Sequence, residues 1–210
     1  MTVGRIIETP ECVSEGADWL AQSCPHMAYA IEQTGPLPLR RRPDGFAQLL
    51  SAIVSQQVSV ASANAIWGRM KDAGLIGPRK IQWASDDDMR AVGLSRQKIR
   101  YARALAGAGI KFKALRDAPD DDVIATLTQV SGIGPWTAEV YAMFSLGRAD
   151  VFAPGDLALQ EAAHILYDLP GRPTEKEFRH MALAWSPWRS VAARVLWAYY
   201  RIIKDREGIR

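Results

Sequence analysis

The sequence has few of the residues that bind transition metals or form disulfides. Its 210 residues include two cysteines, Cys12 and Cys24, and three histidines, His26, His164 and His180. These residues are scattered and lack the close ligand spacing of a zinc or iron–sulfur site. We therefore expect no transition metal and no disulfide framework, and a reduced, cytoplasmic environment suits this cysteine usage.

Long apolar runs and strand-like alternation are also scarce. No stretch approaches the roughly 20 apolar residues that cross a membrane, and none has the pattern of a signal peptide. Alternation of apolar and polar residues, which marks a half-buried strand, is not found over any convincing length. The sequence therefore predicts an all-α protein with no membrane span and no export.

Apolar content and charge set the remaining limits. Apolar residues make up 48% of the chain, which is enough for one domain or two packed lobes, and the net charge is +3. This mildly basic balance allows a nucleic-acid partner without requiring one.

Arg40, Arg41 and Arg42 form a compact tract that is either solvated charge or a phosphate contact, and Asp44 can cap the helix that follows. Further positive charge recurs on an expected helix near residues 95–106, where a solvated face is the simplest interpretation: Arg96, Lys98, Arg100 and Arg103.

The most informative stretch is residues 128–139, where an apolar helical run meets a tight turn and a second helix starts at once. Gly132 and Gly134 allow positive φ and expose main-chain N–H groups, while Pro135 is a preferred first residue of a helix. Such N–H groups, together with the positive end of a helix dipole, can bind phosphate. A plain corner between two helices is the alternative from these residues alone.

Asp156 is the candidate reactive residue. The loop of residues 148–155 spans up to about 26 Å when extended, enough to return the chain to the turn, so Asp156 could lie beside it. A carboxylate there suits a reaction whose transition state develops positive charge. Asp156 also precedes Leu157 as a helix N-cap would. The two roles are compatible, because a cap also fixes the position of the carboxylate.

At this point the sequence resembles a known family. Val-Ser-Gly-Ile-Gly-Pro-Trp-Thr-Ala at residues 130–138 and Asp-Val-Phe-Ala-Pro-Gly-Asp at residues 150–156 resemble the helix-hairpin-helix (HhH-GPD) DNA glycosylases, most closely the bacterial DNA-3-methyladenine glycosylase II group. Residues 52–61, residues 185–190 and Trp197 follow the family's order. The resemblance covers about residues 46–200.

The resemblance implies a two-lobed helical fold with an active-site cleft between the lobes. Residues 1–45 together with 148–210 would form a terminal lobe carrying the catalytic aspartate, and residues 46–147 a central lobe ending in the hairpin at about 119–147. The implied activity is monofunctional: the enzyme flips 3-methyladenine, 7-methylguanine or a related lesion from duplex DNA and hydrolyses its bond to the sugar. It also implies a monomer without a cofactor, acting in the cytoplasm at the nucleoid.

The resemblance also implies roles for single residues. Asp156 falls on the catalytic aspartate, and Trp136 and Trp197 fall in the base pocket. The DNA-binding positions are Gln57, which would fill the gap left by the flipped base, and Gly132, Ile133, Gly134 and Thr137. The main-chain carbonyls of Thr128, Val130 and Ile133 match a site for a sodium or potassium ion.

Departures from relatives define the expected chemistry further. Bifunctional relatives have a lysine two residues after the second hairpin glycine, and Trp136 stands there, so we expect no β-lyase step. No cysteine follows Cys24, which excludes the iron–sulfur branch of the family. Val140 replaces an aromatic residue of the pocket, although Tyr141 is adjacent, so the shape of the pocket stays open.

Two other functions compete with the glycosylase. One is a non-catalytic DNA-binding module that keeps the hairpin, and the other is a helical protein-interaction domain. Likewise Gln56 or Gln57 could simply bond the backbone of its loop. Release of free base from alkylated DNA, and the dependence of DNA affinity on salt, separate the three functions.

Overall fold

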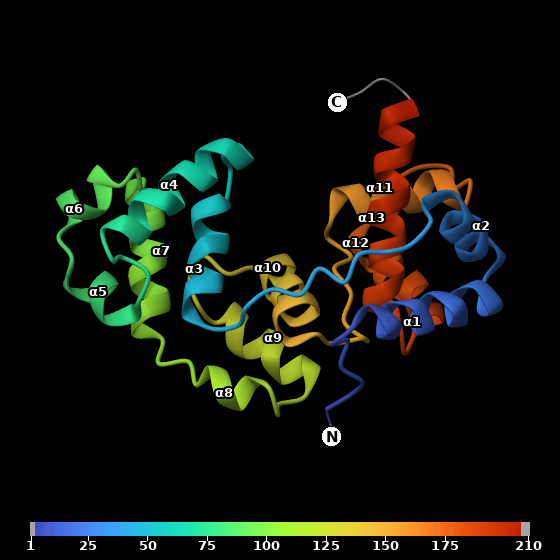
Figure 1. Ribbon diagram of the computed structural model, residues 1–210, viewed down its shortest axis with the longest axis horizontal. Helices are drawn as coiled ribbons and strands as arrows, with labels where there is room; N and C mark the ends of the chain where they lie inside the picture. The colour runs from blue at the N-terminus through green and yellow to red at the C-terminus, as the bar shows by residue number, and fades with distance from the viewer. Residues whose placement is uncertain (1–2, 207–210) are drawn as a thin grey trace. The chain divides into compact units, whose positions relative to one another are not determined.

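The computed structural model describes residues 3–206 and shows a helical protein (Figure 1). Within that range there is no β-strand, and an isolated bridge joins Ile6 to Arg148. The all-α prediction is therefore confirmed. No helix in this part of the chain is both long enough and apolar enough to cross a membrane.

The chain divides into two compact units, which we describe separately. Among the described residues, the first unit comprises residues 42–141, and the second combines residues 3–41 with residues 142–206. The first unit therefore contains the middle of the chain, coloured teal to yellow in Figure 1, and the second brings both ends of the chain together.

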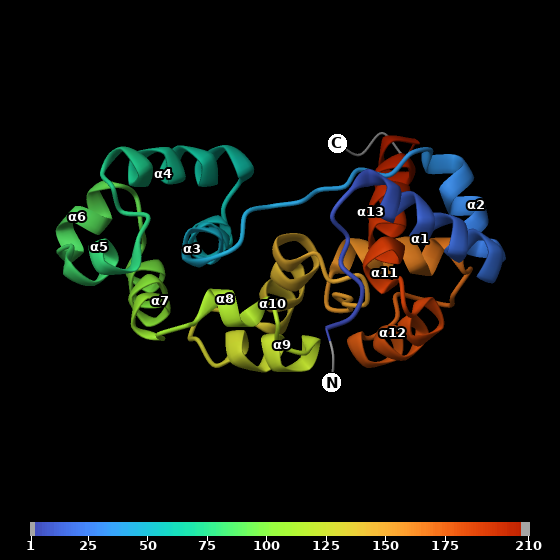
Figure 2. The same cartoon turned by 60° about the horizontal axis from the view of Figure 1, so that its bottom comes forward.

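The first unit is built around α3. Its helices are α3 (Phe46–Ser55), α4 (Val60–Asp72), α5 (Pro78–Trp83), α6 (Asp86–Ala91), α7 (Arg96–Gly107), α8 (Phe112–Leu115), α9 (Asp120–Thr128) and α10 (Pro135–Tyr141). Leu49, Leu50 and Ile53 of α3 are fully buried, as expected from apolar residues at helical spacing. Figure 2 shows α3 end-on, with α4 on one side and α7 on the other, and both pack against it.

The start of α3 differs from the expectation that Asp44 caps it. Gly45, with φ of 103°, is the N-cap and provides no side-chain hydrogen bond. The Asp44 carboxylate instead accepts hydrogen bonds from Arg116 Nε and Nη2 at 2.7 and 3.1 Å. The Gly45 N–H donates to the Tyr141 hydroxyl at 2.7 Å. The predicted cap is therefore wrong, because a glycine turn and an ion pair take its place.

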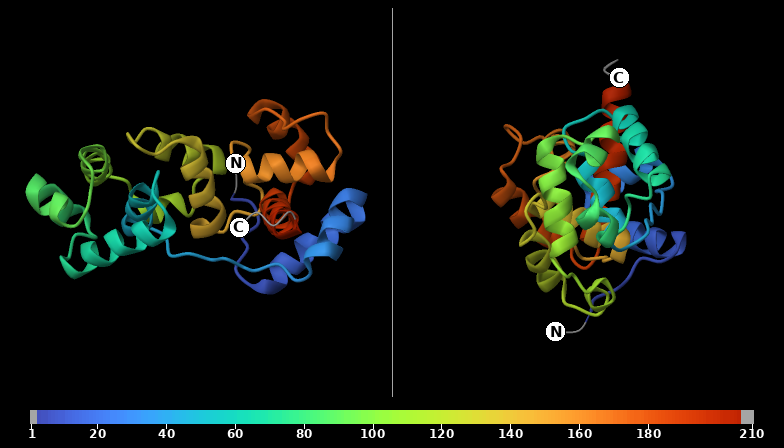
Figure 3. Two further views of the ribbon diagram at one scale, coloured as in Figure 1. Left: turned by 90° about the horizontal axis from the view of Figure 1, so that it is seen from above. Right: turned by 90° about the vertical axis from the view of Figure 1, so that its left-hand side faces the viewer.

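The second unit is built around its last helix. Its elements are α1 (Pro10–Ser23), α2 (Pro25–Thr34), the π-helical turn η1 (Ala142–Leu146), α11 (Leu157–Leu166), α12 (Glu175–Met181), the 3-10 turn η2 (Ala182–Trp185) and α13 (Arg189–Arg206). Val191, Val195 and Leu196 of α13 are fully buried. The left view of Figure 3 shows α13 nearly end-on between α11 and the pair α1 and α2, all of which pack against it.

Arg41, from the middle of the basic tract, is used inside the second unit. Its Nη1 donates to the Ser145 carbonyl at 3.1 Å, and the guanidinium lies against Gly147, whose φ is +77°. A Cβ at Gly147 would collide with this guanidinium. Arg41 thus satisfies a carbonyl at the end of η1, which is neither of the roles considered from the sequence.

Candidate functional site

The hairpin turn between α9 and α10 uses its two glycines differently. Gly132 has φ of +95°, whereas the described positive-φ residues do not include Gly134. A Cβ on Gly132 would lie 2.7 Å from Tyr101 Cβ, and a Cβ on Gly134 would meet nothing within 4 Å. Tyr101 is itself held by Gln97, whose Nε2 donates to the tyrosine hydroxyl at 2.7 Å. The turn therefore requires glycine at position 132. At position 134, the space that a side chain would occupy is open.

The other hairpin positions differ in exposure. Ile133 and Thr137 are buried, whereas Gly134 and Pro135 are exposed. The Ile133 N–H already donates to the Val130 carbonyl at 2.9 Å. A DNA contact from Ile133 or Thr137 would therefore have to come mainly from the main chain. Their role in DNA binding stays a prediction.

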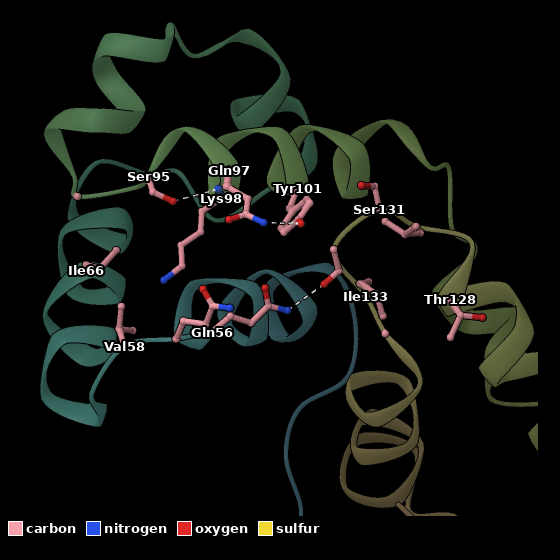
Figure 4. A pocket seen from close by; sticks show the side chains of 15 residues that line it. Gln56, Val58, Ile66, Ser95, Gln97, Lys98, Tyr101, Thr128, Ser131 and Ile133 are labelled. Carbon is pink, nitrogen blue, oxygen red and sulfur yellow. Dashed lines mark hydrogen bonds between the residues drawn. The ribbon is translucent and has the colours of Figure 1, made fainter. Parts of the chain in front are cut away.

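The loop between α3 and α4 is tied to this hairpin. Gln56 Nε2 donates to the Gly132 carbonyl at 2.9 Å (Figure 4). The next residue, Gln57, is exposed and has φ of +55°, in the left-handed region. The sequence did not decide which glutamine bonds the backbone. Gln56 bonds the backbone of the hairpin and not that of its own loop, whereas the side chain of Gln57 is exposed.

A groove of about 740 Å³ joins these segments within the first unit (Figure 4). It is lined from the loop after α3, from α7 and from the hairpin, by residues that include Gln56, Gln57, Val58, Ser95, Gln97, Lys98, Tyr101, Thr128, Val130, Ser131, Gly132, Ile133 and Gly134. The two predicted DNA-contact segments, the loop and the hairpin, therefore share one surface.

Lys98 differs most from its expected place on a solvated helix face. It is only 9% exposed, and its Nζ donates to the Val54 carbonyl in the last turn of α3 at 2.6 Å. Burial lowers the pKa of this ammonium group. The Lys98 ammonium group thus satisfies a carbonyl in the last turn of α3, just before Gln56 and Gln57. The sequence signal was its spacing, because Lys98 shares a stripe with the buried Ile99, Ala102 and Leu105.

The expected monovalent-cation site falls in the same groove. Thr128, Val130 and Ile133 all line it, and carbonyl oxygens are suitable ligands for a hard cation. The Thr128 hydroxyl is turned away to the Ile124 carbonyl, at 2.8 Å, so only its main chain is a candidate ligand. Among the described residues, no three His, Cys, Asp or Glu side chains are grouped to hold a metal. The residues fit a cation, and the site stays a prediction.

In the second unit, Asp156 caps α11 as the sequence predicted. Its Oδ1 accepts hydrogen bonds from the N–H groups of Ala158 at 3.0 Å and Leu159 at 3.1 Å. The same oxygen accepts a third bond, from Trp197 Nε1 of α13, at 3.2 Å. The carboxylate is therefore attached to two helices, α11 through its cap and α13 through an indole.

The two tryptophans assigned to the base pocket lie in different units. Trp136, near the start of α10, is 46% exposed, and Trp197 is half-buried beside Asp156. Tyr141, adjacent to Val140, is buried inside the first unit. Its ring is 3% exposed, its hydroxyl is bound by the Gly45 N–H, and burial raises its pKa to about 12.

Comparison with known proteins identifies the family. Residues 50–189 match the model of the HhH-GPD superfamily of base excision DNA repair proteins. The chain belongs to this superfamily, so the prediction of the family is confirmed. DNA-3-methyladenine glycosylase 1 of Schizosaccharomyces pombe is 34% identical over 179 residues, which cover 80% of this chain and 78% of that protein.

Solved structures agree with this result. The crystal structure of a DNA-3-methyladenine glycosidase from Bacillus halodurans matches with a TM-score of 0.80 at 34% identity, over 96% of this chain and 94% of the other. The S. pombe 3-methyladenine DNA glycosylase in complex with abasic DNA matches with a TM-score of 0.75 at 31% identity, over 87% of this chain and 95% of the other.

Proposed function

We propose that this protein is a 3-methyladenine DNA glycosylase that releases alkylated purines from duplex DNA and so starts base excision repair. The similar proteins named above carry this activity in their names, and one is bound to abasic DNA, the product of such a reaction. The observation that carries the proposal in this chain is Asp156, a carboxylate that accepts hydrogen bonds from three N–H groups and that the resemblance assigns to catalysis. We expect 7-methylguanine and related lesions as further substrates, and a monomer acting on the genome.

Asp156 suits the chemistry of such a substrate. Alkylation at N3 or N7 gives the purine a positive charge, which makes it a good leaving group and attracts it to aromatic rings. As the bond to the base breaks, the sugar develops oxocarbenium character, and a fixed carboxylate stabilises that charge. Asp156 would also orient or deprotonate the attacking water. Trp136 and Trp197 would provide the aromatic walls for the base.

Recognition of the duplex is assigned to the first unit. The exposed Gly134 and the main chain around it would contact the phosphate backbone, and the exposed Gln57 would fill the gap left by the flipped base. Gln56 supports this assignment because it joins the Gln57 loop to the hairpin. A phosphate contact and an inserted side chain would then act from one groove.

The proposal is tested with duplex DNA carrying labelled 3-methyladenine and 7-methylguanine. We expect the protein to release free methylated bases and to leave alkali-labile abasic sites. Asp156→Asn should release base at least about 100-fold more slowly, because the amide can keep the cap but has no negative charge. Its thermal unfolding midpoint and its affinity for DNA should stay near those of the wild type.

The two alternative functions give different results in the same samples. Salt-dependent DNA binding with no base release would indicate a non-catalytic DNA-binding module. Absence of both would indicate a protein-interaction domain. An Asp156→Asn protein that releases base at the wild-type rate would remove Asp156 from the mechanism while leaving the glycosylase activity in place.

A further inference from the structure

The indole N–H of Trp197 is directed at the carboxylate of Asp156. Nε1 lies 3.2 Å from Oδ1, although the two residues are 41 positions apart in the sequence. They meet because α13, which carries Trp197, packs against α11, which Asp156 caps. Such a bond to an ionised acceptor is stronger than one between neutral groups. Stacking of a base on the indole ring does not require this hydrogen bond, so the bond points to a separate role for Trp197.

The third bond changes how firmly the carboxylate is held. The N–H groups of Ala158 and Leu159 both belong to the first turn of α11, so they approach Oδ1 from one side. These two donors tie the oxygen to α11. Trp197 donates to the same oxygen from a second helix. A reaction that depends on where a charge lies gains from this restriction of the carboxylate's orientation.

The surroundings of Trp197 fix the direction of its N–H. The ring of Phe144 lies 5.6 Å from the indole, centroid to centroid, at an angle of 34°. The guanidinium carbon of Arg194 lies 4.8 Å from the centroid of Phe144. Arg194 is 1% exposed and is itself bonded to Ser190 and to the Leu39 carbonyl. A held cation thus supports Phe144, and Phe144 supports the indole.

We propose that Trp197 is a positioning residue that acts through its indole N–H, by holding the Asp156 carboxylate in the orientation needed for base release. The inference rests on the proposed glycosylase function and adds to it a second role for Trp197. The ring can still line the base pocket. The rate of the chemical step, however, depends on the hydrogen bond and not only on the aromatic surface.

The test removes the N–H and keeps the ring. In the protein, Trp197 is replaced by 3-benzothienylalanine, in which sulfur takes the place of the N–H group of indole. We expect single-turnover base release to fall about tenfold or more, the range for loss of a hydrogen bond to a charged group. The loss should be similar for a cationic lesion, 7-methylguanine, and a neutral one, hypoxanthine. Affinity for DNA containing an abasic-site analogue should change less than twofold.

The control is the same replacement at Trp83, a residue that is 80% exposed in the first unit. It should leave base release unchanged. A wild-type rate in the Trp197 isostere would overturn this inference alone, because stacking survives the change. A loss confined to the cationic lesion would also overturn it and would assign the effect to a weaker cation–π attraction of the benzothiophene ring. If the wild-type protein releases no base from any lesion, the proposed function fails and this inference fails with it.

A second measurement does not depend on folding of the isostere. In ¹⁵N-tryptophan-labelled protein, the indole N–H resonance of Trp197, assigned by its loss in Trp197→Phe, should move when Asp156 is changed to Asn. The indole proton should also exchange with solvent more slowly than that of Trp83. An indole resonance that does not respond to Asp156→Asn would overturn the hydrogen bond on which the inference stands.

Discussion

Gly132 and Gly134 stand one residue apart in the same turn, yet they are required for different reasons. Gly132 adopts a left-handed backbone and packs against the Tyr101 ring, so its lack of a side chain serves the fold. Gly134 does not share this backbone, and a Cβ there would enter open space. The lack of a side chain at Gly134 is therefore useful only if something outside the protein approaches it closely.

Alanine at each glycine separates these roles. Gly132→Ala should lower the free energy of unfolding by about 1 to 3 kcal/mol, because alanine there would combine a positive φ with a clash against Tyr101. Gly134→Ala should leave the thermal unfolding midpoint nearly unchanged and weaken binding to a short duplex about tenfold, because the methyl group would keep phosphate from the main chain. Circular dichroism and fluorescence anisotropy measure the two effects. Wild-type DNA affinity in Gly134→Ala would argue against a phosphate contact there.

At the scale of elements, Tyr141 joins the end of α10 to the start of α3. Its buried hydroxyl accepts the Gly45 N–H, and burial raises its pKa from the ordinary value of 10.0 to about 12. The folded protein therefore holds this proton more tightly than the unfolded chain does. The resulting stabilisation is complete below about pH 10 and is lost as the pH rises through about 12.

Tyr141→Phe should remove this alkaline dependence. At pH 8 the variant should be less stable by about 1 to 2 kcal/mol, because the Gly45 N–H loses its acceptor. Between pH 10 and 12 its stability should fall less steeply than that of the wild type. Urea unfolding at a series of pH values gives both quantities. Tyr29→Phe, at a position that is 48% exposed, is the control and should keep the wild-type slope.

Elements whose signals are local could be predicted from the sequence. Asp156 caps α11 and Thr174 with Glu177 forms a capping box, because each pattern lies within one helical turn. The hairpin was equally visible, since two glycines and a proline occur together. The wrong cap at Asp44 shows the limit of such rules. Its partner, Arg116, is 72 residues away, and this ion pair competes with the local cap.

The contacts that complete the candidate site could not be predicted, because they depend on packing between distant segments. Gln56 reaches Gly132 across 76 residues, and Lys98 reaches Val54 across 44. The bond from Trp197 to Asp156 likewise requires α11 and α13 to pack in one register. The sequence gives the residue types at these positions, but neither the sequence nor the resemblance says which atoms form the bonds.

At the scale of the whole molecule, the proposed functions are divided between the two units. The first carries the hairpin, the groove and Trp136, and the second carries Asp156, Trp197 and the support behind them. The match to the Bacillus halodurans structure extends over 96% of this chain, so both units belong to the shared fold. The chemistry expected of the chain depends also on a group that the first unit lacks, the lysine amine found in bifunctional relatives.

The first unit has a tryptophan where bifunctional relatives have a lysine. An amine can attack C1′ of an abasic site, lose water to form an imine and be fixed by borohydride as a secondary amine. Because Trp136 cannot do this, the wild-type protein should leave an intact strand at each abasic site and give no borohydride-trapped adduct. Strand breaks should appear only after alkali.

The converse experiment introduces the missing amine. Trp136→Lys, incubated with preformed abasic DNA and borohydride, should give a covalent protein–DNA adduct on a denaturing gel. The matched control is Trp83→Lys, which adds a lysine at another exposed position of the same unit and should give none. Trapping by the wild-type protein would show that another amine of the chain reaches the sugar and would contradict this prediction. Trapping by Trp136→Lys alone, together with strand breaks that form without alkali when borohydride is left out, would show that the residue two positions after Gly134 decides between hydrolysis and lyase chemistry.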